Sequence, residues 1–176
     1  MRQVFSLVLA STALALLAGP SLAKDKAEGL DLTPLLDGFV QGCDFSEPLY
    51  DLIASLRPTT RDGGTLAVPE GYADVVGEPT HEGDGEGAQI YHLPLPGQWH
   101  GQPVVGIDFV NQDDAGMFVA AVRFVGDESA VTAQFDPLVE QSQAMLDEEE
   151  MSVDFGHVVL LDNDQGVMRL ICNLST

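Results

Sequence analysis

Residues 158–174 read VVLLDNDQGVMRLICNL, and this stretch decides the fold more than any other. Apolar residues alternate with other residues on both sides of a polar centre, which is the period of a β-strand. The centre contains Gly166, a residue type that suits a tight turn. The stretch therefore predicts an antiparallel hairpin whose second strand places Cys172 on an apolar face, beside Leu170 and Leu174.

The acidic centre of this hairpin also suggests a calcium loop. Asp162 and Asp164 have the first ligand spacing of an EF-hand, but glycine is not at the sixth position and Asn173 stands where the closing glutamate belongs. A turn is the preferred interpretation, with calcium binding at the tip as the alternative. A second acidic tip contains Asp113 and Asp114, and the two tips would share a cation if they met in space.

A second pair of strands precedes this hairpin. Residues 99–111 and 117–125 alternate in the same way around the turn sequence QDDAG. Residues 90–96, IYHLPLP, are interrupted by prolines and predict an edge strand at best. Tyr91 and Trp99 stand beside these prolines as a candidate contact surface for a peptide or saccharide. The alternative is that both aromatic side chains pack across the sheet.

Three segments have the apolar spacing of helices. The first begins at Thr33-Pro34 and runs toward Cys43, the second covers 46–56 and is expected to stop at Pro58, and the third begins at Asp136-Pro137. The order is helix, helix, strands, helix and two strands. It predicts a single α+β domain in which a mainly antiparallel sheet carries its helices on one face.

The first 23 residues predict a cleaved secretory signal peptide. Arg2 precedes an apolar run, and Ser21-Leu22-Ala23 ends it with the small residues that signal peptidase requires. The run is too short for a good membrane span. The remaining 24–176 would form one domain of a periplasmic or secreted protein, with 24–31 as a loose leader and 78–88 as an acidic, glycine-rich loop.

The two cysteines, Cys43 and Cys172, lie outside this leader. In an oxidising compartment, two cysteines most simply form one disulfide. The predicted bond ties the first helical region to the last strand and closes nearly the whole domain.

The chain is strongly acidic, with 28 Asp and Glu residues against seven Lys and Arg. Loss of Arg2 with the leader would leave a formal charge of −22. This sign disfavours nucleic acids and anionic membranes as partners. It favours either a cationic protein partner or a surface that stays hydrated in salty surroundings.

Candidate chemistry in the sequence is sparse. Potential ligands of a transition metal gather in one region without a standard spacing: His81, Glu82, Asp84, Glu86, His92 and His100. Motifs of nucleophilic catalysis and phosphate-binding loops are absent from the sequence. The expected function is therefore an exported, non-enzymatic binding domain, with a cationic protein as its partner. A calcium- or metal-binding protein and a small periplasmic hydrolase are the alternatives.

Overall fold

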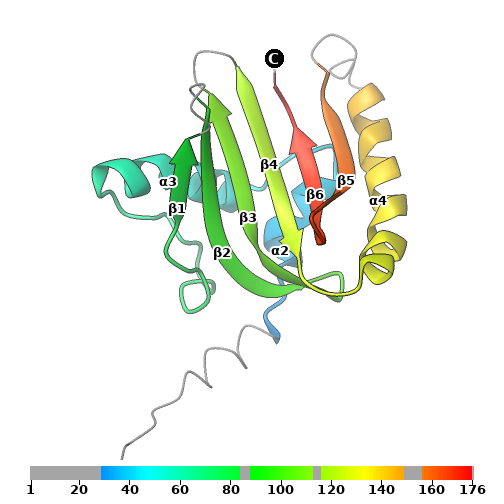
Figure 1. Cartoon of the computed structure of the whole chain (residues 1–176), viewed down its shortest axis with the longest axis horizontal. Coiled ribbons are helices and arrows are strands. Elements are labelled where there is room, and N and C mark those ends of the chain that lie inside the picture. Colours follow the sequence, from blue (N-terminus) through cyan, green and yellow to red (C-terminus); the bar gives the residue numbers. More distant parts are fainter. Residues whose placement is uncertain (1–28, 84–87, 113–115, 149–155, 176) are drawn as a thin grey trace, which may run out of the picture.

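The computed structural model describes residues 29–83, 88–112, 116–148 and 156–175, and it confirms the predicted α+β class. The predicted signal peptide lies outside the described residues. Within them, six strands form one antiparallel sheet in the order β1-β2-β3-β4-β6-β5 (Figure 1). The strands are β1 (Thr80–Gly83), β2 (Gln89–Trp99), β3 (Gln102–Gln112), β4 (Met117–Phe124), β5 (Val158–Asp164) and β6 (Val167–Asn173).

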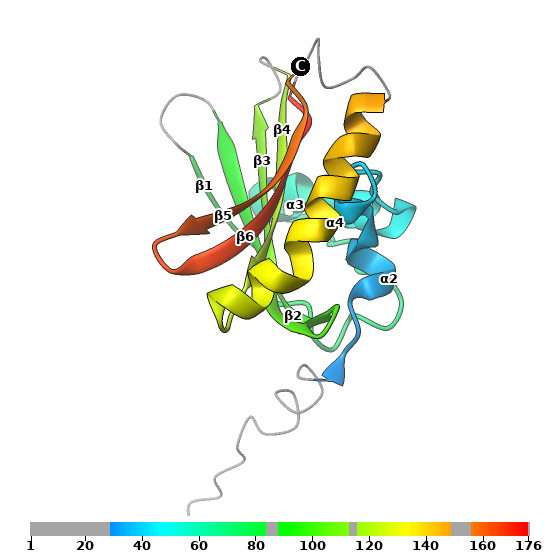
Figure 2. The same ribbon diagram turned by 90° about the vertical axis from the view of Figure 1, so that its right-hand side faces the viewer.

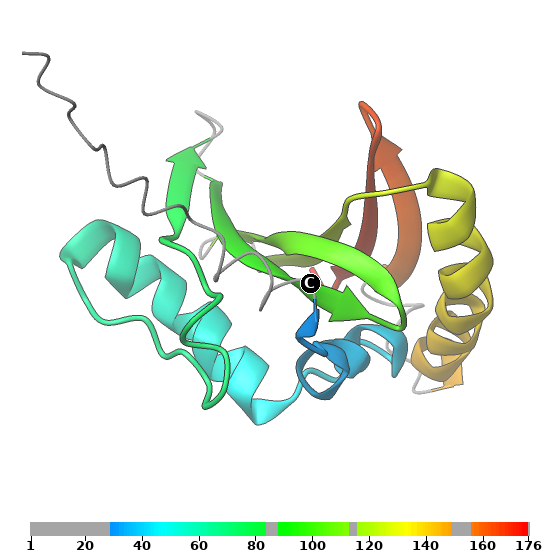
Figure 3. The same ribbon diagram turned by 90° about the horizontal axis from the view of Figure 1, so that it is seen from below.

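All described helices lie on one face of this sheet, as predicted (Figures 2 and 3). They are α2 (Thr33–Leu36), the 3-10 helix η1 (Asp37–Val40), α3 (Glu47–Asp62) and α4 (Glu128–Glu148). Among these helices, none combines the length and the apolarity that a membrane span requires. The inward residues of the strands and the apolar stripes of the helices meet in one core, in which the largest side chains are Trp99, Tyr91, Phe39 and Phe135.

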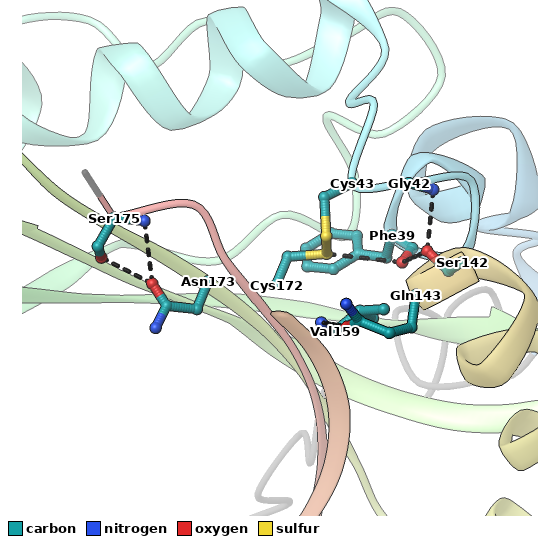
Figure 4. Close-up of a disulfide and its surroundings, with 9 residues drawn as sticks. All are labelled: Phe39, Gly42, Cys43, Ser142, Gln143, Val159, Cys172, Asn173 and Ser175. Carbon is teal, nitrogen blue, oxygen red and sulfur yellow. Dashed lines mark hydrogen bonds between the residues drawn. A yellow bond between two sulfur atoms is a disulfide. The ribbon is translucent and has the colours of Figure 1, made fainter. Parts of the chain in front are cut away.

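The predicted disulfide joins Cys43 to Cys172 across this core (Figure 4). Both residues are buried, and their Cα atoms are 5.9 Å apart. Beside the disulfide, the N–H of Gly42 donates to Ser142 Oγ on α4 (2.9 Å). The same hydroxyl donates to the carbonyl of Phe39 (3.3 Å). The disulfide and the serine therefore attach one short segment to both β6 and α4.

We expect the substitution Ser142→Ala to lower the free energy of unfolding by about 1–3 kcal/mol, because it leaves buried backbone groups without their partner. Urea unfolding monitored by circular dichroism measures the loss. Gln141→Ala is a matched control, since Gln141 is the exposed neighbour on the same helix. Equal losses in the two variants would mean that the serine bridge contributes nothing specific.

Helix α3 does not stop at Pro58, contrary to the prediction. It continues for another turn to Asp62 and ends where Gly63 adopts a left-handed conformation, with φ 68°. A proline inside a helix removes one N–H donor but leaves its own carbonyl available. That carbonyl accepts from Gly64 N–H (3.0 Å), and Thr60 Oγ1 donates to the carbonyl of Leu56 (2.9 Å). These local bonds hold the last turn of the helix beyond the proline.

Helix α4 begins earlier than predicted, at Glu128 rather than near Pro137. Asp127 caps it, because its Oδ1 accepts from Ala130 N–H (3.0 Å). Val131 and Phe135, which precede the predicted start of the helix, are buried in the core. Their burial stabilises the first two turns despite the proline that follows.

Two predictions for the region before residue 100 also need correction. Residues 80–83, expected in a loop, form β1, and this strand pairs with the start of β2 from Gln89 to His92. β2 is therefore an interior strand there, although prolines had suggested an edge. Its prolines lie beyond the paired part, where the N–H of Gly77 donates to the carbonyl of Pro94 (2.9 Å).

The end of the predicted loose leader is also ordered. The N–H of Gln98 donates to the carbonyl of Leu30, and the N–H of Leu32 donates to the carbonyl of Gln98, both over 2.7 Å. Asp31 Oδ1 accepts from Thr33 N–H (2.9 Å) at the start of α2. Hydrogen bonding to Thr33 lowers the pKa of the Asp31 carboxyl below its usual value. The helix thus begins at Thr33, and Asp31 supplies the side-chain acceptor at its start.

The hairpin of β5 and β6 confirms the interpretation of residues 158–174. Its tight turn is Gln165-Gly166, with φ values of 54° and 88°. Asn163 Oδ1 accepts from the N–H of Gly166 (2.8 Å) and so stabilises the turn. A second tight turn, His100-Gly101, divides the segment 99–111 that was predicted as one strand, since Trp99 pairs with Gln102.

Candidate functional site

The face of the sheet opposite the helices forms a trough. β1 on one side and the β5–β6 hairpin on the other extend away from the helix layer, while β3 and β4 lie between them (Figure 3). A depression of about 580 Å³ occupies this face. Its lining residues define the trough: Glu82, Ile90, His92, Asp108, Val110, Val119, Ala121, Arg123, Asp164, Gln165, Val167, Arg169 and Ile171.

Strand periodicity explains why charged residues face the trough. Asp108, Arg123 and Arg169 each stand between two apolar residues of their strand that are directed into the core. Successive side chains of a strand point to opposite faces, so burial of the neighbours forces these three side chains outward. The apolar neighbours of each residue carry this signal in the sequence itself.

A network of charged and polar side chains crosses the trough from β1 to β4. His92 Nδ1 lies 2.8 Å from Asp108 Oδ1, and because a carboxylate only accepts, the imidazole donates this hydrogen bond. His92 Nε2 is 3.6 Å from Glu82 Oε1. Arg123 Nε lies 3.0 Å from Asp108 Oδ1, an ion-pair distance, although its N–H does not point along the contact. Asp108 therefore connects a histidine to an arginine.

Two arginines stand directly opposite each other on neighbouring strands. Arg123 on β4 pairs in register with Arg169 on β6. Like charges at opposite positions of a sheet destabilise it unless other charges compensate. Arg169 contacts the carboxylates of β5, with Nη2 2.6 Å from Asp162 Oδ2 and Nη1 3.3 Å from Asp164 Oδ2. The charge of Arg123 is thus compensated by Asp108 on β3, and the charge of Arg169 by the two carboxylates on β5.

Together these residues form a charged stripe: Glu82, His92, Asp108, Arg123, Arg169, Asp162 and Asp164. The outer acids are the most exposed, at 68% for the Glu82 side chain and 50% for Asp164, whereas the two arginines are 28–29% exposed. A molecule approaching the trough therefore meets carboxylates at both rims before it meets the arginines on the floor. Ion pairs this exposed contribute only about 0–1 kcal/mol each to folding, so their main effect is on the polarity of the surface.

An apolar patch occupies the floor beside the stripe. Within it, Ile90, Val110 and Val119 are cross-strand neighbours, and Ala121 pairs with Ile171. All but the alanine are partly exposed, since in the described part of the chain no helix or strand packs on this face. The trough consequently offers both apolar contact and charge.

The predicted contact surface of Tyr91 and Trp99 is wrong, because the two side chains are 1% and 0% exposed. They point into the helix-covered core, and Trp99 Nε1 donates to Asp37 Oδ1 (2.9 Å). The alternative, packing within the domain, describes them correctly. Of the same segment, only His92 and Ile90 reach the trough.

The predicted metal ligands are dispersed. Asp162 and Asp164 both contact the guanidinium of Arg169, and Asp113 and Asp114 lie outside the described residues. His100 Nε2 lies 3.0 Å from Asp37 Oδ1, on another part of the molecule from the trough.

Of the other predicted transition-metal ligands, His81 stacks on Tyr91, while Glu82 and His92 are 3.6 Å apart in the trough. Asp84 and Glu86 are not described. Within residues 29–83, 88–112, 116–148 and 156–175, no group of three or more His, Cys, Asp or Glu side chains is placed to hold a metal ion.

The trough brings a carboxylate–histidine pair together with an apolar floor. A carboxylate–histidine pair can transfer protons, but the lining side chains that the structure describes include no hydroxyl, thiol or amine beside it. Charge and apolar surface are both present, as in ligand-binding depressions, whose volumes are about 300–1,000 Å³. No protein-family model matches the chain, and comparison with curated proteins and with solved structures also gave no match.

Proposed function

We propose that the protein is an exported binding domain that holds part of a cationic protein in the trough. Export is supported by the leader pattern of residues 1–23 and by the disulfide, since disulfides form and persist in oxidising compartments. The binding role rests on the trough itself, which combines an apolar floor with charge on a face that the described helices leave uncovered.

One observation carries the choice of a cationic partner: the most exposed charges of the trough are the carboxylates at its rims. Glu82 stands on β1 and Asp164 at the end of β5, while the two arginines lie lower and are already paired. The formal charge of −22 without the leader acts in the same direction at longer range. A strong field of one sign raises the rate at which opposite charges arrive.

Calorimetric titration of the oxidised protein with polylysine tests this function. We expect saturable binding at low salt and an affinity that falls about tenfold or more at high salt, because salt screens exposed charges. Polyglutamate of the same length is the control and is expected not to bind. An affinity for polylysine that is unchanged by salt would defeat the electrostatic proposal.

The same protein should be melted in calcium chloride and in sodium chloride of matched ionic strength. Equal shifts of the melting temperature are expected, since both salts then act by screening. A saturable rise with calcium alone would reveal a ligand of the native state by mass action. That outcome would favour the calcium-binding alternative over the cationic partner.

A further inference from the structure

Resting on this proposed function, we infer that the trough accepts an extended segment with apolar side chains in the middle and a basic residue at each end. The geometry also points to Arg169 as an internal competitor of that segment. Both statements follow from the order of charges and apolar residues across the sheet.

The direction of the segment follows from the strand order and the register. Glu82 and Asp164 stand on the two outermost strands, separated by five strand-to-strand steps. The strand pairings place Val158 of β5 in the same row as Glu82, and Asp164 lies six positions further along β5. A segment with basic residues at both ends therefore reaches both rims when it crosses the strands obliquely.

An extended chain suits the shape of the trough. Its residues alternate in direction, so only the side chains of one face need to enter the depression of about 580 Å³.

The apolar patch determines what the middle of the segment must be. Ile90, Val110 and Val119 form one cross-strand row, and Ile171 with Ala121 forms the next. Covering partly exposed aliphatic side chains with other aliphatic groups removes apolar surface from water. A segment with polar residues in the middle would lose this contribution and retain only the attraction at its ends.

Arg169 already makes the contact that a basic residue of the partner would make. Its guanidinium lies on the carboxylates of Asp162 and Asp164. A ligand cation at this rim shares the carboxylates with it and is repelled by its charge. Arg169→Gln should therefore strengthen binding several-fold, whereas Asp164→Asn should weaken it.

The test uses the synthetic peptide KSVSVSVSK, in which both lysines and the three valines are at odd positions and so share one face of an extended chain. Titration followed by amide NMR shifts gives both the affinity and the location of binding. We expect the shifts to concentrate on the strand residues that line the trough. A peptide with serine in place of valine, at the same charge, should bind several-fold more weakly, and one with glutamate ends should not bind.

Variants separate this site from the charge of the whole protein. Glu82→Gln on β1 should weaken binding, while Glu140→Gln is the control, because Glu140 is exposed on α4 and its loss changes the net charge equally. The affinity of Glu82→Gln for the peptide also tests the site at β1, independently of Arg169 and the β5–β6 hairpin. The melting temperature of each variant shows that it is folded.

Three outcomes would overturn the inference: shifts confined to the helix layer, an unchanged or lower affinity of Arg169→Gln, or tighter binding of the peptide with glutamate ends. The last would assign Arg123 and Arg169 to recognition of an anion. Salt-sensitive binding of polylysine would still stand in the first two cases, so binding of a cationic protein would survive as the function, but in the first case the trough would not be its site. Loss of polylysine binding would remove the function itself.

Discussion

Removal of the disulfide between Cys43 and Cys172 is expected to lower the free energy of unfolding by about 4–5 kcal/mol. The bond joins residues separated by 129 positions, so it closes almost the whole described domain into one ring. In the chain-entropy model, such a ring restricts the unfolded chain far more than the folded one. For a domain of ordinary stability, this loss is a large part of the total.

Guanidinium unfolding of the oxidised protein and of the double variant Cys43→Ala/Cys172→Ala measures this effect. Unfolding of the natural chain in a reducing agent is the matched control, since it removes the bond but keeps both sulfur atoms in the core. The free energies of unfolding of the double variant and of the reduced natural chain should agree within about 1 kcal/mol, because both proteins lack the cross-link. A decrease below about 1 kcal/mol in both would show that the unfolded chain is already compact without the bond.

Trp99→Ala is expected to cost about 3–5 kcal/mol, because it empties the largest fully buried site of the core. The indole lies against three phenylalanine rings, with centroid distances of 4.7 Å to Phe135, 6.0 Å to Phe124 and 6.1 Å to Phe39. The substitution removes these contacts and leaves Asp37 without the indole N–H, which donates over 2.9 Å. The cavity and the lost hydrogen bond both lower the free energy of unfolding.

The variant Trp99→Phe separates the two contributions. It retains an aromatic ring in the core but removes the N–H, and we expect a loss of about 1–3 kcal/mol. Urea unfolding followed by far-ultraviolet circular dichroism suits all three proteins, because Trp99 is the single tryptophan and its fluorescence is lost in both variants. Equal losses in the two variants would show that the contact with Asp37, and not ring packing, dominates.

Local periodicity was sufficient to predict the parts of the fold whose apolar residues repeat without interruption. Leu49, Leu52, Ile53 and Leu56 are all buried on α3, as their helical spacing predicts. Hairpin β5–β6 likewise follows from alternation, and its phase correctly placed Cys172 in the core. Such patterns depend only on which residues must leave water, and neighbours in the chain determine that.

Proline rules failed where tertiary contacts outweighed them. Pro58 and Pro137 both lie inside helices, although each had been taken as a boundary. In α4 the deciding residues are Val131 and Phe135, whose burial the chain order alone did not reveal. The loss of one backbone hydrogen bond is small beside the burial of a phenylalanine and a valine.

Composition and period are properties of the sequence by itself, and they determine four features of the protein. These are the acidic surface, the disulfide, the antiparallel α+β class and the outward direction of Asp108, Arg123 and Arg169. Only the tertiary structure brought β4 beside β6 and so placed Arg123 opposite Arg169. It also brought the lining residues of the trough together on the face that the described helices leave uncovered. The physical reason is that period assigns each side chain to a face, whereas strand order and register depend on contacts between residues far apart in the chain.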